Sequence, residues 1–452
     1  MDSFDFVIIG AGAAGEAAAH KVRERGASVA IIERELIGGS CAYWACIPSK
    51  SLLHAAAVHR LGGDYPWPKA SARRDYMINR VDRDFPDDSS RERALRRVGA
   101  EVIRGTAQIK GPGEVEARTA DGTRRLSART IVVATGSTSR VPDLDGLVHT
   151  VPWTNREATS TRELPRSLLV LGGGPSGVEL AQVFARYGVP TTIVEHNPRI
   201  AAHDHPRNSA AIEAGLRADG VTVRTGVKAI RARPNGGPDG AHAIDFSDGT
   251  EATGHVVLLA VGREFALEGF GLETLGIDPR ARGGAPPDGR LRLQDGLYLI
   301  GDPAGPELHT HVSHYQGEMA VRMALGDDVR PDYRALPRAT YTDPEAAFVG
   351  MSLEDAQKAG IDAFEKVADL GKSAKGYAVE AGGHVTIVVD RRSAELVGAA
   401  IAGPGASEAI HEAVLAIKAR TPIEVLADTI HAFPTTARVL GGLFVEAAKE
   451  LG

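Results

Sequence analysis

Two cysteines and a lysine in one short segment are the residues of this chain whose types and spacing could support redox chemistry. Cys41 and Cys46 are the only cysteines among 452 residues, and Lys50 follows one helical turn after the second. Two thiols this close can form a disulfide, but such a bridge closes a very small loop and removes little entropy from the unfolded chain. The spacing therefore favours a reactive pair over a structural staple, with two unrelated thiols as the simpler alternative.

A glycine-rich loop upstream of the cysteines predicts a dinucleotide-binding site. Residues 4–9 are mostly apolar and end in three β-branched residues, as in a buried parallel strand, and an alanine-rich helix follows the loop. Gly10 allows the tight turn, Gly12 lets the backbone approach a pyrophosphate, and Gly15 lets the helix pack closely on the strand. The N-terminus of that helix would face the phosphates.

The next strand completes this unit. Residues 28–32 are mostly apolar, and the strand ends in Glu33, about 20 residues beyond the glycines, where a carboxylate can hold ribose hydroxyls. A glycine triplet alone is weak evidence. A triplet between a strand and a helix, followed by an acid at the next strand end, is strong evidence.

The same pattern occurs a second time. A strand at 167–171 leads into a loop with Gly172, Gly174 and Gly177, a helix is predicted from 178 to about 187, and a strand at 191–194 ends in an acid. One real site beside a coincidental glycine loop is the alternative. Because strand, helix and terminal acid all match, we expect two dinucleotides to bind this chain.

The acid of the second unit bears on the choice of nicotinamide cofactor. Glu195 at the strand end can accept hydrogen bonds from both ribose hydroxyls and would repel a 2′-phosphate, which favours NADH. His196 and Arg199 are close in sequence and could meet such a phosphate, so NADPH stays open.

Composition limits the class of protein. The length suggests about three domains, and the 43% hydrophobic content suits a large globular core. A net charge of −6 does not suggest nucleic acid as a partner, and the arginine pairs at 73–74 and 96–97 are typical of solvated helix faces. We find no signal peptide and no apolar run that could span a bilayer, so the sequence predicts a cytoplasmic protein without a membrane partner.

Other stretches predict the remaining elements. Turn signals at 111–113 and 121–122 suggest a small antiparallel excursion, and the segment 62–97 is predicted to form surface helices or loops. Residues 280–287 form a predicted surface loop, and a helix is expected through 408–418. Further short strands are predicted at 102–107, 130–133, 256–261, 297–300, 384–390 and 395–399.

The two nucleotide loops and the cysteine segment resemble those of the pyridine nucleotide–disulfide oxidoreductases. This family includes dihydrolipoamide dehydrogenase, glutathione reductase and mercuric reductase, and the resemblance covers nearly the whole chain. It implies an α/β fold with two Rossmann-like dinucleotide-binding domains and an α+β C-terminal dimerisation domain. The expected limits are 1–147 for the first part of the FAD-binding domain, 148–266 for the NAD(P)-binding domain, 267–335 for the second part of the FAD-binding domain and 336–452 for the dimerisation domain.

The resemblance implies FAD at the first loop and NADH or NADPH at the second. The implied cofactor contacts come from the loops at strand ends and from the cysteine segment. They are Gly10, Gly12, Ala13, Ala14, Gly15, Glu33, Gly39, Ser40, Lys50, Ala107, Ala134, Thr135, Gly136, Gly172, Gly174, Gly177, Glu195, Gly262, Arg263, Gly301, Asp302, Thr310 and His311.

The resemblance also implies the catalytic roles. Cys46 would lie against the flavin as a thiolate, and Cys41, the outer thiol, would attack an oxidised substrate. Lys50 would stabilise charge beside the flavin and pair with Glu179. Relatives form two-fold dimers in which the C-terminal segment completes the partner's active site, so we expect a homodimer.

The chain departs from the family at its C-terminus. Many members carry a histidine before Pro-Thr and a glutamate five residues later, and that pair is the acid/base for disulfide exchange. Here Phe433 and Arg438 occupy these positions, and His431 lies two residues away, where a structural role is the better interpretation. General acid–base help is worth about 10²–10⁴ in rate, so glutathione-type or lipoamide-type turnover is not expected to be efficient. The C-terminal cysteine pair of mercuric reductases is missing too, which disfavours mercury as the natural substrate.

Two further segments leave alternatives open. Tyr43 and Trp44 between the cysteines could shape an apolar pocket, shield the thiols or belong to the core. His309, His311 and His314 look like a metal cluster, but capping or packing of a helix is the better interpretation because no carboxylate or cysteine completes a recognisable ligand set, and we predict no metal site.

We therefore predict an FAD-dependent NAD(P)H oxidoreductase with a redox-active Cys41–Cys46 disulfide and a small-molecule, disulfide-type acceptor. One alternative is a flavin diaphorase that reduces quinones or metal ions without needing the disulfide, which Phe433 favours. The other is a redox-responsive binding or regulatory flavoprotein without enzymatic activity.

Overall fold

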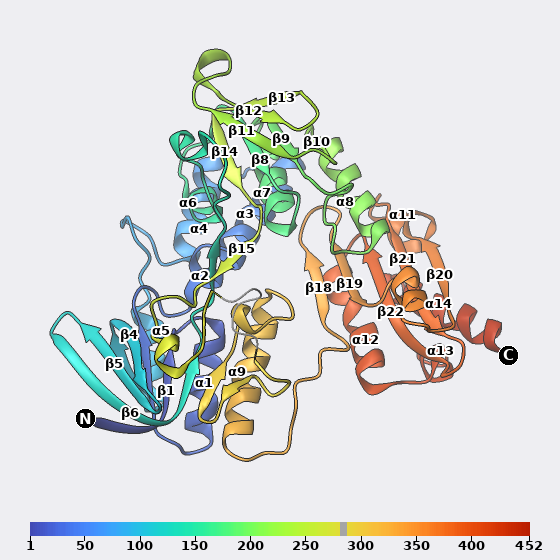
Figure 1. Cartoon of the computed structure of the whole chain (residues 1–452). Coiled ribbons are helices and arrows are strands. Elements are labelled where there is room, and N and C mark those ends of the chain that lie inside the picture. The colour runs from blue at the N-terminus through green and yellow to red at the C-terminus, as the bar shows by residue number, and fades with distance from the viewer. Residues whose placement is uncertain (281–286) are drawn as a thin grey trace. The chain divides into compact units, whose positions relative to one another are not determined.

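The computed structural model describes residues 1–280 and 287–452, and the predicted loop at 280–287 therefore lies mostly outside the described residues (Figure 1). Within these residues the chain forms two compact units, each made of separate stretches of sequence. The first unit comprises 1–51, 72–140 and 263–331, and the second comprises 52–71, 141–262 and 332–452.

The first unit is built on a sheet with the strand order β16-β17-β6-β1-β2-β3. The central strand β1 pairs in parallel with β2 and β6, and its alternate residues pack into different apolar clusters: Phe6 and Ile8 in one, Val7 and Ile9 in the other. The second half of β1, Phe6–Ile9, is buried on both faces, which is why these residues read as a continuous hydrophobic run. The strands are β1 (Asp2–Ile9), β2 (Val29–Glu33), β3 (Glu101–Arg104), β6 (Gly122–Val133), β16 (Arg292–Gln294) and β17 (Leu297–Leu299).

An antiparallel excursion extends this sheet, as predicted from the turn signals. Strand β4 pairs with β5, and β5 pairs with β6. A short ribbon of β7 and β15 lies apart from the main sheet. These strands are β4 (Thr106–Gly111), β5 (Glu114–Thr119), β7 (Ser137–Ser139) and β15 (Arg263–Phe265).

Helices α1 and α9 pack against each other in the first unit (Figure 1). Gly317 of α9 permits this contact, because a Cβ there would lie 2.5 Å from the carbonyl oxygen of Ala14 in α1. The helices of this unit are α1 (Ala13–Glu24), α2 (Gly39–Tyr43), α5 (Ser89–Arg97) and α9 (Thr310–Ala324). Residues of α3 (Cys46–Arg60) and α4 (Trp67–Met77) belong to both units.

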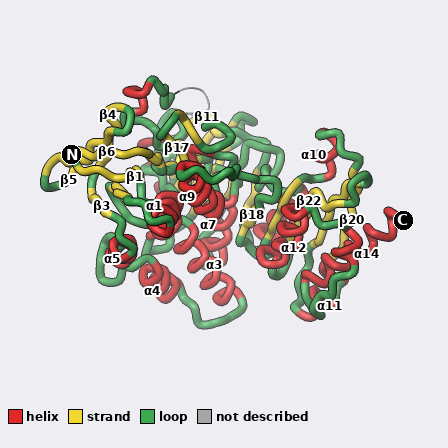
Figure 2. The backbone as a smooth tube through the Cα atoms, turned by 90° about the horizontal axis from the view of Figure 1, so that it is seen from below, coloured by secondary structure: helices red, strands yellow, loops and turns green. Residues whose placement is uncertain are grey.

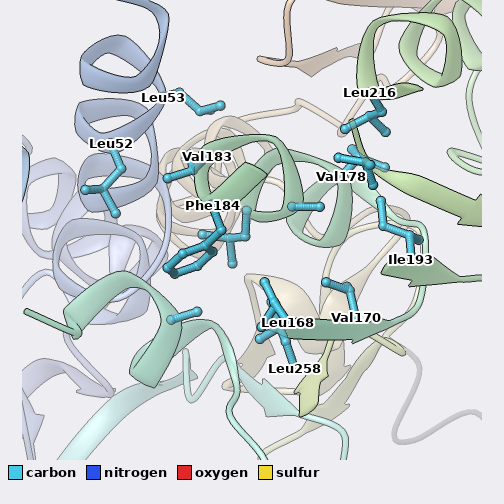
Figure 3. Close-up of a cluster of buried hydrophobic side chains, with 14 of the residues drawn as sticks. Leu52, Leu53, Leu168, Val170, Val178, Val183, Phe184, Ile193, Leu216 and Leu258 are labelled. Carbon is cyan, nitrogen blue, oxygen red and sulfur yellow. The ribbon is translucent and has the colours of Figure 1, made fainter. Parts of the chain in front are cut away.

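The second unit contains a parallel sheet with the order β10-β9-β8-β14. Helix α7 turns Val178, Val183 and Phe184 into a buried cluster that also holds Leu168 and Leu258 of the sheet (Figure 3). An antiparallel ribbon, β11-β12-β13, accompanies this sheet. The elements are α6 (Asn155–Ser160), β8 (Leu168–Leu171), α7 (Pro175–Arg186), β9 (Thr191–Val194), α8 (Pro206–Ala218), β10 (Thr222–Arg224), β11 (Ala229–Arg233), β12 (His242–Phe246), β13 (Glu251–Gly254) and β14 (Val256–Leu259).

The second unit also contains an antiparallel C-terminal sheet with the order β18-β19-β22-β21-β20. Helices α12 and α14 lie against this sheet and bury Ile410, Leu440 and Phe444 with the apolar residues of its strands (Figure 2). The elements are β18 (Pro337–Thr340), β19 (Ala346–Gly350), α10 (Leu353–Lys358), β20 (Ala363–Asp369), α11 (Ala374–Ala378), β21 (His384–Asp390), β22 (Glu395–Ala402), α12 (Ala406–Ala419), α13 (Ile423–Ala427) and α14 (Thr436–Leu451).

The predicted fold class is confirmed. The structure is α/β, with one Rossmann-type parallel sheet in each unit and an α+β C-terminal part in the second unit. One helix begins earlier than expected, because Pro175 fits the first position of α7, where its missing N–H costs nothing. Among the described helices, none combines the length and apolar character that a bilayer crossing requires.

One prediction about charged residues is wrong. Arg74, expected on a solvated helix face, is fully buried, and its Nε donates to Asp75 Oδ1 at 2.8 Å. Arg80 bonds the same carboxylate oxygen at 2.7 Å. Sequence could not reveal this burial because tertiary packing decides which face of a polar helix is covered.

A buried polar network links α8 to the C-terminal sheet within the second unit. His384 Nε2 lies 2.9 Å from Asn208 Oδ1, and its Nδ1 lies 2.9 Å from Thr386 Oγ1. Asn208 Nδ2 in turn donates to Asp204 Oδ1 and to the carbonyl oxygen of Ala347. Burial lowers the pKa of His384 from 6.5 to about 3, with the nearby charges of His205 and Arg207 acting in the same direction.

This network predicts a loss of stability in mild acid. The folded pKa of His384 lies below its unfolded value, so the unfolded chain takes up the extra proton and stability falls as pH drops from 6.5 toward 3. One such proton contributes a slope of up to about 1.4 kcal/mol per pH unit. Burial raises the pKa of Asp204, which opposes this slope, so the comparison is made between variants.

We expect urea unfolding, followed by circular dichroism, to show that the free energy of unfolding declines more steeply from pH 7 to pH 5 in the wild type than in His384→Gln. His20→Gln, at an exposed position on α1, serves as the matched control and should keep the wild-type slope. Equal slopes for wild type and His384→Gln would contradict the prediction.

Candidate functional site

The first nucleotide loop is shaped by close backbone contacts that exclude side chains. Gly10 has a φ of +100°, and a Cβ there would lie 2.4 Å from the carbonyl oxygen of Ala134. A Cβ at Gly15 would lie 1.9 Å from the carbonyl oxygen of Gly10. Only glycine fits at these two positions, which explains the pattern read from the sequence.

The loop leaves the start of α1 accessible. Gly12 is the N-cap residue in extended conformation, and within the described chain no side chain caps the helix. A Cβ added at Gly12 would approach only the Cα of Gly39, at 4.0 Å. Unbonded N–H groups at a helix N-terminus bind phosphate, so this end of α1 could hold a pyrophosphate.

Glu33 closes the loop from the end of β2. Its Oε2 accepts a hydrogen bond from the backbone N–H of Ala11 at 2.7 Å, and its Oε1 accepts one from that of Glu35 at 2.7 Å. The carboxylate is thereby oriented beside the glycine loop. A carboxylate oxygen can accept more than one hydrogen bond, so Glu33 could also accept from ribose hydroxyls.

The loop after β6 fits a cofactor with polar groups. In the described part of the chain, the buried hydroxyl of Thr135 has no hydrogen-bond partner, and such groups are normally satisfied by protein, water or ligand. A Cβ on the neighbouring Gly136 would meet open space. The residues present therefore fit the FAD that the sequence predicts. Ala107, also predicted as a contact, is buried in β4 within an apolar cluster.

A cluster of hydrogen-bonded polar side chains lies between this loop and the start of the 3₁₀ turn at 302–304. The hydroxyl of Ser137 bonds the carboxylate of Asp302, and Arg263 Nε donates to Ser137 Oγ at 2.5 Å and Nη2 to its carbonyl oxygen at 2.7 Å. Arg263, predicted as a cofactor contact, has its Nε 3.6 Å from Asp302 Oδ2. Gly301, the residue before Asp302, donates its N–H to Gln316 Oε1 at 2.8 Å.

The two thiols come together where α2 ends and α3 begins. Cys41 lies in α2, Cys46 is the first residue of α3, and both are thiols in the structure. The hydroxyl of Thr310, the first residue of α9, lies 3.5 Å from Cys46 Sγ. The pKa of Cys41 is raised above its ordinary value, first by a hydrogen bond with Cys46 and then by burial, while Thr310 acts in the opposite direction.

The aromatic residues between the thiols belong to the core. Tyr43 and Trp44 are buried with Leu36 and Ile78, and the Trp44 ring lies 5.7 Å from that of Phe85. Burial raises the pKa of Tyr43 to about 12. Of the alternatives left open by the sequence, the core interpretation is the one that the structure supports.

The histidines before and within α9 form pairs rather than helix caps. His309 is the N-cap residue, but its side chain makes no cap hydrogen bond among the described residues. Its Nε2 lies 3.0 Å from Glu307 Oε2, and its ring stacks on that of His311 with 5.0 Å between centroids and 12° between planes. Across the described chain, no three His, Cys, Asp or Glu side chains gather as a metal ion would need.

The second nucleotide loop repeats the geometry of the first. Gly172 has a φ of +103°, and a Cβ there would lie 2.3 Å from the carbonyl oxygen of Ala260. A Cβ at Gly177 would lie 2.2 Å from the carbonyl oxygen of Gly172, while positions 174 and 262 face open space. The first turn of α7 could therefore hold a second pyrophosphate.

Glu195 occupies the place that Glu33 takes in the first unit. Its Oε2 accepts from the N–H of Gly173 at 2.7 Å, and its Oε1 accepts from the N–H and the Nδ2 of Asn197 at 2.8 and 2.7 Å. The exposed ring of His196 also lies 2.9 Å from Oε1. The guanidinium of Arg199 bonds the carbonyl oxygens of Ala201 at 3.0 Å and Ala202 at 2.7 Å, as well as the hydroxyl of Ser209.

Glu179 lies on α7 in the second unit and is buried. Its Oε1 accepts a hydrogen bond from the N–H of Tyr341 at 3.0 Å. Lys50, on α3, belongs to the first unit, and the predicted Lys50–Glu179 pair stays a prediction.

The C-terminal motif presents an apolar side chain at the position where the family resemblance led us to expect a histidine. The side chain of His431 is only 6% exposed, and its Nε2 lies 2.7 Å from Glu412 Oε1. A Cβ at Gly441 would lie 2.4 Å from His431 Nδ1, so α14 packs directly on this ring. Phe433 is 74% exposed. His431 therefore stabilises its own domain, and Phe433 faces outward.

Comparisons with known proteins agree over nearly the full chain. Residues 4–317 match the family described as "Pyridine nucleotide-disulphide oxidoreductase", and residues 336–443 match its dimerisation domain. A dihydrolipoyl dehydrogenase from Thermus scotoductus is 33% identical, covering 100% of this chain and 98% of the relative. A mercuric reductase from Streptomyces lividans is 32% identical, covering 97% and 94%.

Solved structures give the same result. The Cu(II) complex of the HOCl-induced flavoprotein disulfide reductase RclA from Escherichia coli has a TM-score of 0.88 and 25% identity, covering 99% of this chain and 100% of that chain. LpdA from Mycobacterium tuberculosis has a TM-score of 0.86 and 25% identity over both full chains. This chain therefore belongs to the pyridine nucleotide–disulphide oxidoreductases, enzymes that use FAD and NAD(P)H.

Proposed function

We propose that this protein passes electrons from NAD(P)H through FAD and a redox-active Cys41–Cys46 disulfide to a small disulfide acceptor. The observation that carries this proposal is the hydrogen-bonded pair of thiols beside the Thr310 hydroxyl. Bound FAD would supply the two-electron transfer between the nicotinamide and the disulfide.

The chain's own groups would hold that cofactor at the first loop. Glu33 would accept hydrogen bonds from ribose hydroxyls, and the N-terminus of α1 at Gly12 would bind the pyrophosphate. The buried hydroxyl of Thr135 and the carboxylate of Asp302 are the further polar groups proposed to contact it. Arg263 orients Asp302 through Ser137.

The two thiols would take different roles. The Thr310 hydroxyl can donate to Cys46 Sγ, and Lys50 follows one turn later on α3, so a thiolate at Cys46 would be stabilised by a donor and a cation. Cys41 would attack the acceptor. Its raised pKa means that a proton acceptor or the field of bound cofactors must help to form its thiolate.

For the second loop we propose NADH as the preferred cofactor. Glu195 is oriented by the N–H of Gly173, and its charge would repel a 2′-phosphate. Arg199 bonds the carbonyl oxygens of its own loop, which leaves it poorly placed to bind a phosphate.

A flavin diaphorase that reduces quinones or metal ions is the second candidate. Phe433 favours it, since such acceptors need no proton from a C-terminal histidine. RclA, one of the similar structures, was solved as a Cu(II) complex. The anaerobic NADH titration described below separates the two candidates.

We also propose a homodimer in which the C-terminal segment lies at the partner's active site. Ile430 and Phe433 are 98% and 74% exposed, and contacts with a second copy would remove these large apolar side chains from water. Sedimentation analysis should give the mass of two chains, and a monomer would contradict this proposal.

Anaerobic titration with NADH tests the path of electrons. We expect a long-wavelength charge-transfer band before the flavin absorbance bleaches, because a Cys46 thiolate would lie against oxidised flavin. Cys46→Ser should lose this band, while Cys41→Ser should keep it and lose turnover with disulfides. General folding is checked by the flavin spectrum of each variant. Direct bleaching without the band, with both variants as active as the wild type, would favour the diaphorase.

The nucleotide preference is tested by stopped-flow reduction with NADH and NADPH. The wild type should be reduced faster by NADH, and Glu195→Gln should narrow the difference, because it removes the charge but keeps an oxygen for the Gly173 N–H. Arg199→Lys should leave the ratio unchanged. A selective loss of NADPH reduction in Arg199→Lys would instead place Arg199 on a 2′-phosphate.

A further inference from the structure

We propose that Arg91 is a positioning residue of the redox pair. It ties the thiol-bearing helix α2 to the first turn of α1, and it thereby sets how readily Cys41 and Cys46 form their disulfide. This inference rests on the proposed function, because it assigns a role toward that same pair of thiols. Arg91 and both cysteines belong to the first unit.

The segment that leads into α2 is joined to the first nucleotide loop through its backbone. The N–H of Gly38 donates to the carbonyl oxygen of Ala11 at 2.8 Å, and a Cβ at Gly39 would lie 2.9 Å from the Cα of Gly12. These contacts determine where α2 begins. Cys41 is the third residue of α2, so the position of its sulfur also depends on what holds the rest of this short helix.

Helix α5 supplies a second set of contacts to this segment. Asp88, its N-cap residue, accepts a hydrogen bond from the N–H of Ile37 at 2.6 Å, and Arg104 of β3 bonds the same carboxylate at 2.7 Å. Gly38 has a φ of +108°, and a Cβ there would lie 2.8 Å from Arg91 Nε. The guanidinium therefore occupies the space that a side chain at position 38 would take.

The far end of the Arg91 side chain reaches α1. Its Nη1 lies 2.9 Å from Oε2 of Glu16, which stands in the first turn of α1 and has a side chain only 14% exposed. Burial raises the pKa of Glu16, and the charge of Arg91 is the largest effect that opposes this rise. Because the carboxylate is buried, salt screens this ion pair less than it would a surface pair. One side chain thus joins α5, the turn before α2 and the start of α1.

The last residue of α2 also lies near this charge. Burial raises the pKa of Tyr43, and the nearby charge of Arg91 acts against this rise. Arg91 is therefore close to Gly38 before Cys41 and to Tyr43 after it. Loss of the guanidinium should loosen α2 along its whole length.

A fixed α2 matters because two thiols form a bond readily only when they are already held close together. With α2 in place, little further ordering accompanies formation of the S–S bond, so the effective concentration of one thiol at the other is high. Without Arg91 the reduced pair has more freedom, and α2 must become ordered as the disulfide forms. The disulfide is then less stable relative to the dithiol, and its reduction potential becomes less negative.

The thiol–disulfide equilibrium of the FAD-loaded protein tests this role. Protein is equilibrated anaerobically with mixtures of reduced and oxidised glutathione, free thiols are alkylated, and the fraction with a Cys41–Cys46 disulfide is measured by mass spectrometry. In this exchange the dithiol gives two electrons and two protons to glutathione disulfide, which becomes two molecules of glutathione. We expect Arg91→Ala to lower the equilibrium constant for disulfide formation by about tenfold, which corresponds to about 30 mV.

Three further variants show whether the ion pair carries the effect. Glu16→Gln removes the charge that Arg91 bonds but keeps the shape of the side chain, and it should lower the constant in the same direction. Because the two residues act as a pair, the double variant should fall no further than Arg91→Ala alone. Arg93→Ala, at an exposed position on α5, is the matched control and should keep the wild-type constant.

An unchanged constant in flavin-loaded Arg91→Ala, or an equal fall in Arg93→Ala, would overturn the inference. Where Arg91→Ala does not retain its flavin, an unchanged constant in Glu16→Gln overturns it instead. A wild type that forms no Cys41–Cys46 disulfide in any of the glutathione mixtures would refute the proposed function, and this inference with it. The flavin spectrum of each variant shows whether it is folded.

Discussion

A carbonyl oxygen packed where a side chain would otherwise stand is the constraint on which both nucleotide sites depend. In each loop the carbonyl of the first glycine, Gly10 or Gly172, lies about where a Cβ on the third glycine would be. This contact brings the helix onto its strand and aims the N–H groups of its first turn at the loop. The carboxylate of Glu33 or Glu195 then bonds the loop from the end of the next strand. Two short segments far apart in sequence thus have one geometry, because the same close approach determines both.

The thiol segment is joined to the first of these loops by a second close approach. A Cβ at Gly39 would lie 2.9 Å from the Cα of Gly12, so α2 begins directly beside the nucleotide loop. Cys41 follows within α2, and Cys46 opens α3 after a core-forming Tyr43–Trp44 pair. Burying these aromatics anchors the segment between the thiols. The redox pair is therefore positioned by packing on either side and not by the cysteines themselves.

Phe433 stands where the family resemblance led us to expect an imidazole, so a proton for a disulfide acceptor would have to come from another group. His431 stays close in sequence but is bonded to Glu412 inside its own domain. The 307–311 segment, in contrast, combines a carboxylate, two imidazoles and a hydroxyl on Cys46. A disulfide acceptor would need a proton donor other than Phe433, whereas a metal-ion acceptor would need none.

Local pattern by itself determined both nucleotide loops with their acids and the cysteine segment, because each depends on residues within about 25 positions of one another. The family resemblance of these segments then implied the fold class. The antiparallel excursion was also predictable from local pattern, since its turns carry glycine signals. Only the tertiary structure decided which partners the long polar side chains take. Arg74 is buried on Asp75, Arg263 bonds Ser137 beside Asp302, and Arg199 bonds the carbonyls of its own loop. Ser137 lies 126 residues from Arg263, so no spacing reveals that partner, whereas Arg74 and Arg199 bond groups nearby in sequence and only the folded surroundings decide that they do so instead of facing solvent or a phosphate.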